Sequence, residues 1–402
     1  MTHSMKKIFS IVAVMMIAGS YALLFVSFCF YGDGALLGRP SPIGNRGAFP
    51  SVPRVNEGLA DFHFDQGVRY YEGDGVKQDF RTAAWWFWKA AEQGHAGAQF
   101  NLGHCYMEGE GVAKDEKKAV EWWRKAAKRK NADAQFSLGW CYYNGEGVEK
   151  DFSKAVEWWR KAAKQGDAVA QLSLGGCYMD GEGVSKNAKM AVEWFRKAAA
   201  QGNADAQCSL GGCYHHGKGI EKNLTKAVEW YRKSAEQGHA EAQYALGWCY
   251  AEGEGVKKDF TQAAEWWRKA EAQGNADAQC ALGTLYYEGE GVEKDFVKAV
   301  EWHRKAAEQG NAAGQVNLGE CYYKGHGVEQ DFVKAVEWYR KAAEQGNAVG
   351  QYNLGESYYE GNGVEKDIAK ALEWFQKAAD QGDEEAQEMI AKIRAEENRE
   401  GF

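Results

Sequence analysis

The sequence predicts an all-α protein, an α-solenoid of nine 36-residue helix–turn–helix repeats preceded by one hydrophobic helix. Three observations predict it. The segment Ala98–Asp133 recurs at intervals of 36 residues without insertion or deletion. Apolar residues inside each copy recur at helical spacing. Residues 8–31 carry no charge, and a run of that length crosses the roughly 30 Å apolar core of a bilayer as a helix.

The composition agrees with a periodic, folded chain. Among 402 residues there are 48 Gly, 16 Trp and 20 Tyr but only 4 Pro. The net charge of −8, from 49 basic and 57 acidic residues, provides no basic field that would attract nucleic acid. The composition therefore argues against a nucleic-acid-binding protein.

The N-terminal region differs from the repeats. Residues 1–31 are predicted to be an uncleaved signal anchor or a cleavable signal peptide, and the length of the uncharged run 8–31 favours the anchor. Lys6 and Lys7 place the N-terminus in the cytoplasm, and hence the repeats outside it. The alternative is a protein secreted after cleavage of the signal. Residues 32–56 contain all four prolines and are predicted to be an irregular linker.

Residues 57–385 form the predicted solenoid, and residues 386–402 are a polar capping helix. The nine repeats begin at residues 62, 98, 134, 170, 206, 242, 278, 314 and 350.

The first helix of each repeat is short. In the third copy Ala134, Leu138 and Tyr142 stand at helical spacing, after a Lys-Asn-Ala-Asp sequence that marks the start of this helix. A glycine stands in the middle of this helix in all nine copies, at a cost of about 1 kcal/mol relative to Ala. We expect a neighbouring helix to approach closely there. The glycine pair Gly145 and Gly147 then ends the helix with positive φ angles.

The second helix begins after an Asp or Asn N-cap in every copy, such as Asp151, and glycine ends it in eight of nine copies, Lys130 being the exception. Its predicted apolar stripe in the third copy consists of Phe152, Ala155, Val156, Trp159, Ala162 and Ala163. One position of the second helix is tryptophan in all nine copies, from Trp86 to Trp374. One position of the first helix is tyrosine in all nine copies, from Tyr70 to Tyr358. We expect both invariant aromatic residues to lie in the core.

The repeated pattern A-Q-x-x-L-G-x-x-Y-x-x-G-x-G-V-x-K-D-x-x-K-A-V-E-W-x-x-K-A-A-x-Q-G-N-A resembles the Sel-one-like repeat (SLR), a relative of the tetratricopeptide repeat. The resemblance implies a right-handed superhelix whose concave face is lined by first helices, acting as an adaptor or scaffold in protein complexes. In bacteria such proteins are often exported or membrane-attached. A cysteine-rich branch carries a disulfide in each repeat and has a suggested penicillin-related activity. This chain has Ala126 and Ala127 where that branch has its cysteine, which argues against both features.

The cysteines and histidines predict no chemistry. Six cysteines share one position in the first helix, where we expect buried thiols. Cys177 with Cys208 and Cys249 with Cys280 are poorly spaced for disulfides. The densest cluster of metal-binding residue types matches no zinc spacing; it consists of Cys208, Cys213, His215, His216 and His239. We therefore expect no metal, no cofactor and no catalytic residues.

Candidate partner-binding residues are those that vary in the first helix while the repeat frame stays constant. Aromatic side chains exposed on a concave surface serve as anchors for a bound chain, and the alternative is sequence drift with partial burial. The candidates are Phe100, His104, Phe136, Trp140, Tyr244, Trp248, Tyr352 and Glu356.

These observations predict a non-enzymatic scaffold that binds a protein partner, whose identity the sequence does not give. One alternative is a binder of envelope carbohydrate or peptidoglycan, for which exposed Trp and Tyr rings would serve as stacking platforms. A second alternative is a weak hydrolase similar to the β-lactamase-like proteins of the cysteine-rich branch.

Overall fold

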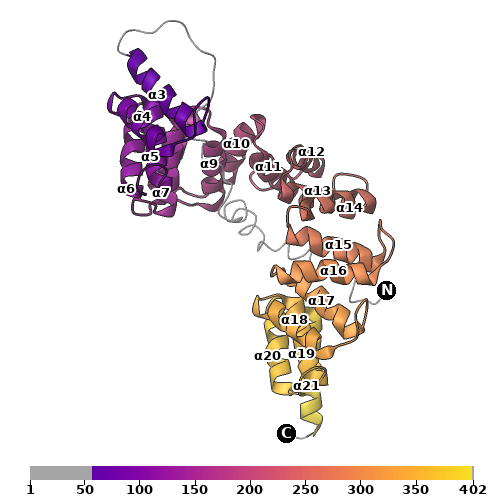
Figure 1. The fold of residues 1–402 in the computed structure, drawn as a ribbon. Coiled ribbons are helices and arrows are strands. Elements are labelled where there is room, and N and C mark those ends of the chain that lie inside the picture. Colours follow the sequence, from indigo (N-terminus) through magenta and orange to yellow (C-terminus); the bar gives the residue numbers. More distant parts are fainter. Residues whose placement is uncertain (1–56, 401–402) are drawn as a thin grey trace. The chain divides into compact units, whose positions relative to one another are not determined.

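The computed structural model describes residues 57–400, which form nineteen helices and no strand in that range (Figure 1). The predicted hydrophobic segment 8–31 and the linker 32–56 lie outside the described residues. No helix within residues 57–400 is both long and apolar enough to span a membrane. The helices form two compact units that divide at Lys222 and Asn223, and each unit is an α-solenoid as the sequence predicts.

Helices of two kinds alternate in the first unit. The first helices of its repeats are α3 (Glu57–Glu72), α5 (Ala96–Glu108), α7 (Ala132–Asn144), α9 (Ala168–Asp180) and α11 (Ala204–His216). The second helices are α4 (Phe80–Glu92), α6 (Glu116–Lys128), α8 (Phe152–Lys164) and α10 (Ala188–Ala200).

The second unit continues the alternation. Its second helices are α12 (Leu224–Glu236), α14 (Phe260–Glu271), α16 (Phe296–Glu308), α18 (Phe332–Glu344) and α20 (Ile368–Ala379). Its first helices are α13 (Ala240–Glu252), α15 (Ala276–Glu288), α17 (Ala312–Lys324) and α19 (Ala348–Glu360), and α21 (Glu384–Glu400) follows the last repeat.

The predicted helix caps are confirmed. Asp151 has an extended backbone, and its carboxylate accepts a hydrogen bond from the Lys154 backbone N–H at 3.0 Å, which satisfies a donor at the start of α8. At the start of α7 the Asn131 side chain accepts from the Ala134 N–H at 2.7 Å. Gly145 and Gly147 have φ angles of 84° and 67°, as predicted for the pair that ends a first helix.

The apolar stripe of the second helix forms the core of each repeat. In α8, Ala155, Val156, Trp159 and Ala162 are buried, and Phe152 at the helix start is half-buried. The aromatic ring at the position of Trp159 explains why the first helix has a glycine in its middle, because the ring lies directly against that glycine. In the preceding repeat a β-carbon on Gly103 would stand 2.5 Å from Cδ1 of Trp123. The Trp123 Nε1–H also donates a 3.0 Å hydrogen bond to the Phe100 carbonyl, so glycine lets the two helices of a repeat approach closely.

The expectation that the invariant tryptophan lies in the core is confirmed only for Trp122, and others such as Trp158 are partly buried and pack against the core from its edge. The buried aromatic is its C-terminal neighbour, Trp159 in α8, whereas Trp158 is only half-buried at the edge of the stripe. Among the nine invariant tryptophans only Trp122 is buried. A lysine three residues later covers the outer face of the ring, as Lys161 does with its Nζ 3.7 Å from the Trp158 ring centroid. Consecutive helical residues point about 100° apart, so two adjacent rings cannot both face the core.

The invariant tyrosine also lies at the edge of the core. Six of the nine are half-buried. In several repeats the hydroxyl accepts a hydrogen bond from an arginine of the preceding second helix, such as Arg124 to Tyr142 at 2.9 Å. A tyrosine with a polar end is stable there because the hydroxyl finds a partner outside the apolar core.

Successive repeats are joined by polar contacts at constant positions. The Gln135 side-chain amide of α7 donates to the Ala127 carbonyl of α6 at 3.3 Å, and the Gln165 amide donates to Gln135 Oε1 at 2.8 Å. A β-carbon on Gly147 would overlap the Glu116 carbonyl oxygen of the preceding repeat. These contacts fix the stacking register and so determine which side chains of the first helices reach the surface.

Candidate binding surface

The first-helix residue that follows the mid-helix glycine differs most between repeats. We call it the variable position. Its occupants are Val68, His104, Trp140, Gly176, Gly212, Trp248, Thr284, Glu320 and Glu356. All except the two glycines are partly exposed. Because the flanking residues keep the same backbone and packing in each repeat, this position can change its chemistry without changing the fold.

Four of the eight sequence candidates lie four residues before the variable position and pack on the core aromatic of their own repeat. Phe100 stacks on Trp123 with ring centroids 6.4 Å apart, and Phe136 on Trp159 at 6.3 Å. Only 2% and 3% of Phe100 and Phe136 is exposed, so the interpretation of these two residues as exposed anchors is wrong. Their rings complete the core because the aromatic of the second helix offers them a flat surface.

The equivalent residues in the second unit are less covered. Tyr244 stacks on Trp267 with ring centroids 6.4 Å apart, and Tyr352 lies tilted against Phe375 at 5.5 Å. Both tyrosines are half-buried. Burial, together with the nearby Glu356 carboxylate, raises the pKa of Tyr352. Tyr352 therefore presents a neutral hydroxyl rather than a charge.

A small hollow in the first unit joins four of the sequence candidates. Phe100 and His104 of α5 line it together with Phe136 and Trp140 of α7. Its volume of ≈ 20 Å³ has room for about one water molecule, too little for a ligand. The Trp140 Nε1–H is buried at its edge without a hydrogen-bond acceptor, and His104 Nδ1 lies 3.7 Å from Glu110 Oε2. The Trp140 N–H is therefore not accessible at the surface, although part of the residue is exposed.

Acidic groups gather at the variable position near the end of the second unit. Glu320 forms an ion pair with Lys324, one turn later in α17. In α19 burial, and then the carboxylates of Glu360 and Glu385, raise the pKa of Glu356. The carboxylates of Glu356, Glu360 and Glu385 therefore lie close enough to repel one another, and a positive group that approached them would reduce this repulsion.

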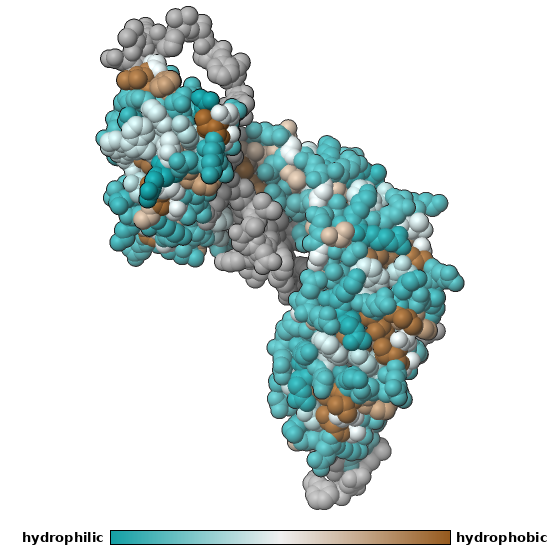
Figure 2. Space-filling view, in the orientation of Figure 1, coloured by the Kyte–Doolittle hydropathy of each residue, from teal (hydrophilic) through white to brown (hydrophobic). Residues whose placement is uncertain are grey.

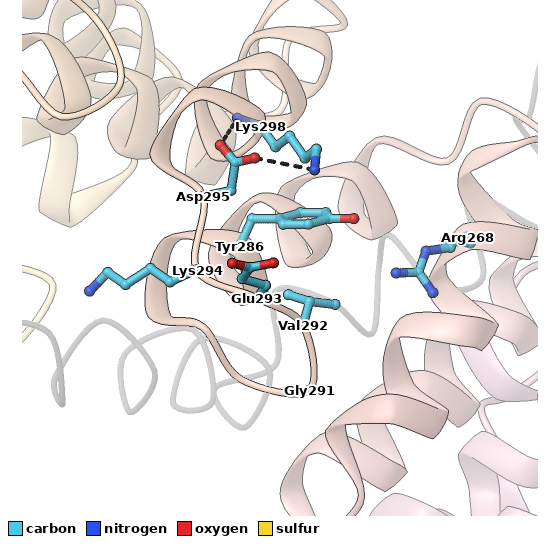
Figure 3. Close-up of a pocket in the computed structure, with 8 residues that line it drawn as sticks. All are labelled: Arg268, Tyr286, Gly291, Val292, Glu293, Lys294, Asp295 and Lys298. Atoms are coloured by element: carbon cyan, nitrogen blue, oxygen red, sulfur yellow. Dashed lines mark hydrogen bonds and ion pairs between the residues drawn. The ribbon is translucent and has the colours of Figure 1, made fainter.

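A larger hollow, not foreseen from the sequence, lies in the second unit (Figure 3). It measures ≈ 470 Å³, and the Tyr286 hydroxyl points across it toward Arg268. In neighbouring repeats this arginine reaches the tyrosine, as Arg304 does with Tyr322 at 3.0 Å. No sequence signal marks Arg268 and Tyr286 as a pair that is not in contact, because the neighbouring repeats have the same two residue types at these positions. The hollow is lined by three cations and two carboxylates, and one of the cations, Lys298, already forms an ion pair with Asp295. The net charge of the hollow therefore does not select a class of ligand.

The eight described cysteines are buried free thiols, as predicted. Burial raises the pKa of Cys105 and of Cys249 to about 12. A thiol with such a pKa is almost fully protonated at neutral pH and is a poor nucleophile. Within residues 57–400 no group of three or more His, Cys, Asp or Glu side chains is arranged to hold a metal ion.

Comparison with known proteins gives a consistent result. Nine consecutive segments match the family model described as Sel1 repeat, namely residues 63–95, 96–131, 132–167, 168–203, 204–239, 240–275, 276–311, 312–347 and 348–383. The crystal structure of a protective antigen from uropathogenic Escherichia coli strains, which displays an SLR fold, is 40% identical and has a TM-score of 0.75; the match covers 84% of this chain and 72% of that chain. A Sel1 repeat protein from Oxalobacter formigenes is 36% identical over 61% of this chain and 96% of that chain, with a TM-score of 0.57. A search of curated proteins gave no match.

Proposed function

Because this chain belongs to the Sel1 repeat family, we propose that it is a non-enzymatic scaffold that binds another protein on the face lined by its first helices. The observation that carries the proposal is the variable position. It changes from Trp140 to Trp248 and then to Glu356 while the packing around it stays constant. Half-exposed Trp rings supply apolar anchors, and the carboxylates toward the end of the chain select a partner with positive charge nearby.

Contacts between helices support the first-helix face as the concave one. First helices of neighbouring repeats touch each other, as α15 does with α17 and α17 with α19. Helices on the inside of a curved stack lie closer together than those on the outside. We infer for each unit the right-handed superhelix of the related repeats, with the variable position on its inner surface.

We further propose that residues 8–31 attach the protein to a membrane, or direct its secretion, and that the repeats lie outside the cytoplasm. The uncharged run after Lys6 and Lys7 supports this topology. The relative that is 40% identical is described as a protective antigen, a description that fits a protein accessible from outside the cell. Ala126 and Ala127 stand where the cysteine-rich branch has its disulfide cysteine, which counts against the alternative of a β-lactamase-like hydrolase.

Site-specific photo-crosslinking tests the binding face. A photoreactive phenylalanine analogue replaces Trp140 or Trp248 in cells that express the full chain. Val297 and Val333 serve as matched controls, because each is 57% exposed but lies on a second helix. We expect one protein adduct from Trp140 or Trp248 and none from the valines. Equal adducts from all four positions would refute the proposed face, and adducts with glycan instead of protein would favour the envelope-carbohydrate alternative.

A labelling experiment tests the topology separately. Ser51→Cys in a Cys29→Ser background introduces one linker thiol, and the eight buried thiols give little background. Reaction with a membrane-impermeant maleimide in intact cells, or after opening only the outer membrane, is expected. Labelling only after the inner membrane is opened would place the repeats in the cytoplasm.

A further inference from the structure

The first repeat departs from the other eight on the outer face of its second helix. Trp85 and Trp88 of α4 occupy positions that elsewhere carry charged or polar residues. At the position of Trp85 the other eight repeats have Glu, from Glu121 to Glu373. At the position of Trp88 they have Arg, apart from Gln376 in the last repeat. The two tryptophans are 47% and 46% exposed, so the repeat frame does not require them for packing.

The start of α3 extends this apolar surface. Leu59 and Phe62 are 53% and 51% exposed, and the Phe62 ring meets the Trp86 ring edge-on with centroids 6.2 Å apart. Figure 2 shows hydrophobic residues gathered where α3 begins. We call Leu59, Phe62, Trp85 and Trp88 the N-terminal aromatic patch. An exposed cluster of large apolar side chains on a soluble domain marks a contact site.

Another repeat cannot cover this patch in the usual register. The position of Phe62 is Ala or Gly in every later repeat, because the preceding second helix crosses it. Ala134 is completely buried there, and a β-carbon on Gly314 would stand 2.7 Å from the Ala306 Cβ. A phenylalanine ring has no space under such a helix, so a second copy cannot stack on this end in the register of the repeats.

The opposite end of the repeats shows how this chain covers an open end. There α21 packs over the last repeat with Ala386 fully buried and Ile393 only 2% exposed. The C-terminal end is thus closed by the chain's own next segment. Among the described residues nothing comparable closes the N-terminal end.

We propose that residues 32–56 fold back and cover the N-terminal aromatic patch. This linker ends at Asn56, three residues before Leu59, and its 25 residues can span up to about 80 Å, far more than one repeat. It contains all four prolines of the chain and apolar residues such as Leu37 and Phe49. Proline-rich segments dock on surfaces lined by aromatic rings, because the extended chain loses little entropy on binding.

Charge supports the same occupant. The linker has Arg39, Arg46 and Arg54 but one acidic residue, Asp33. The first helix presents Asp61, whose side chain is 57% exposed, and the exposed Asp65 beside the patch. These carboxylates attract the arginines of the linker and would repel the same carboxylates of a second copy paired face to face. One cation, Lys89, also lies on the patch, with its Nζ 3.7 Å from the Trp85 ring centroid.

Limited trypsin digestion of the full chain tests the proposal. Trypsin cleaves after Arg46 and Arg54 but not after Arg39, which precedes Pro40. Trp85→Glu with Trp88→Arg restores the residues of the other repeats, and Phe62→Ala does the same in α3, so both variants should fold. Glu157→Gln with Arg160→Gln is the control in the third repeat. The digestions are run in detergent and in lipid nanodiscs at two protein concentrations.

We expect both patch variants to be cleaved after Arg46 and Arg54 roughly tenfold faster than the wild type and the control, because cleavage follows the undocked population. If the patch variants and the wild type are cleaved at equal rates, in detergent as well as in nanodiscs, the proposal is overturned. Faster cleavage in nanodiscs alone would assign the patch to the lipid surface. Protection that disappears on dilution would assign it to a second copy, and either result would overturn docking of the linker. None of these outcomes depends on whether a partner binds the variable position.

Discussion

The imidazole of His303 lies against Gly283, so closely that a β-carbon on Gly283 would stand 2.5 Å from His303 Nδ1. His303 occupies the core position that holds Phe, Trp or Tyr in the other repeats, and only 2% of it is exposed. Its Nδ1 is buried without a hydrogen-bond partner, and burial lowers its pKa from 6.5 to about 3. The seventh repeat therefore contains a neutral, unsatisfied polar ring in its core.

His303→Phe is expected to stabilise the protein and to weaken its pH dependence. The folded state keeps His303 neutral, while the unfolded chain takes up a proton below pH 6.5, so stability falls as the pH falls toward 3. The loss is about 1.4 kcal/mol per pH unit, or about 2 kcal/mol at pH 5. The variant should lack this loss and gain about 1–2 kcal/mol at neutral pH, since an unsatisfied buried polar atom is removed. Urea unfolding at pH 7 and pH 5 checks both effects, and identical pH profiles for the two proteins would contradict the expectation.

Gly103→Ala is expected to destabilise the second repeat, although Ala normally favours helices by about 1 kcal/mol. The new β-carbon would stand 2.5 Å from the buried Trp123 ring and push α5 and α6 apart, at a cost of about 1–3 kcal/mol. Gly166→Ala is the control, because no atom lies within 4 Å and only its φ of 99° is unfavourable. Thermal unfolding followed by circular dichroism compares them. A Gly103→Ala protein as stable as the wild type would mean that the helices are not in close contact.

The two adjacent tryptophans of α8 should differ in their contributions to stability. Trp159→Ala leaves a cavity in the core and should cost about 3–5 kcal/mol. Trp158→Ala removes a half-buried ring and its contact with Lys161, with an expected cost of about 1–2 kcal/mol. Denaturant unfolding of both variants measures the difference. The reverse order would restore the invariant tryptophan as the core residue.

Lys130→Gly is expected to stabilise the loop between α6 and α7 by about 0.5–1 kcal/mol. Lys130 has a φ of 63° and is the one non-glycine residue with positive φ in residues 57–400. Left-handed backbone costs a side-chain-bearing residue about 1–2 kcal/mol, partly offset by the greater freedom of glycine in the unfolded chain. Lys128→Gly, within α6, is the control and should destabilise the protein. A lower unfolding midpoint for Lys130→Gly would show that the lysine side chain contributes more than the backbone costs.

The buried thiols should not react with an aromatic disulfide reagent in the folded protein. Burial raises the pKa of Cys213 and of Cys321 to about 12, so at pH 8 only about one thiol in ten thousand is a thiolate. With Cys29 replaced by serine, absorbance should report no fast reaction in buffer and eight thiols in denaturant. Rapid reaction of several cysteines before unfolding would contradict the buried arrangement.

Local sequence alone determined the repeating frame. The 36-residue period, the N-caps such as Asp151, the glycines that end the helices and the stripe around Trp159 follow from interactions between residues close in the chain. The sequence also locates the variable position, since a constant frame makes a variable residue visible.

Only the tertiary structure decided which side chains that frame covers. The sequence predicts core positions for both Trp158 and Trp159, and the close approach of Gly139 to the Trp159 ring shows that only Trp159 is fully covered. Phe100 appeared to be a surface anchor until the ring of Trp123 was placed beneath it. Leu59 and Phe62 are exposed because no helix precedes α3 among the described residues. Burial depends on residues from other helices, so a repeat pattern does not predict which side chains stay exposed where the described repeats begin.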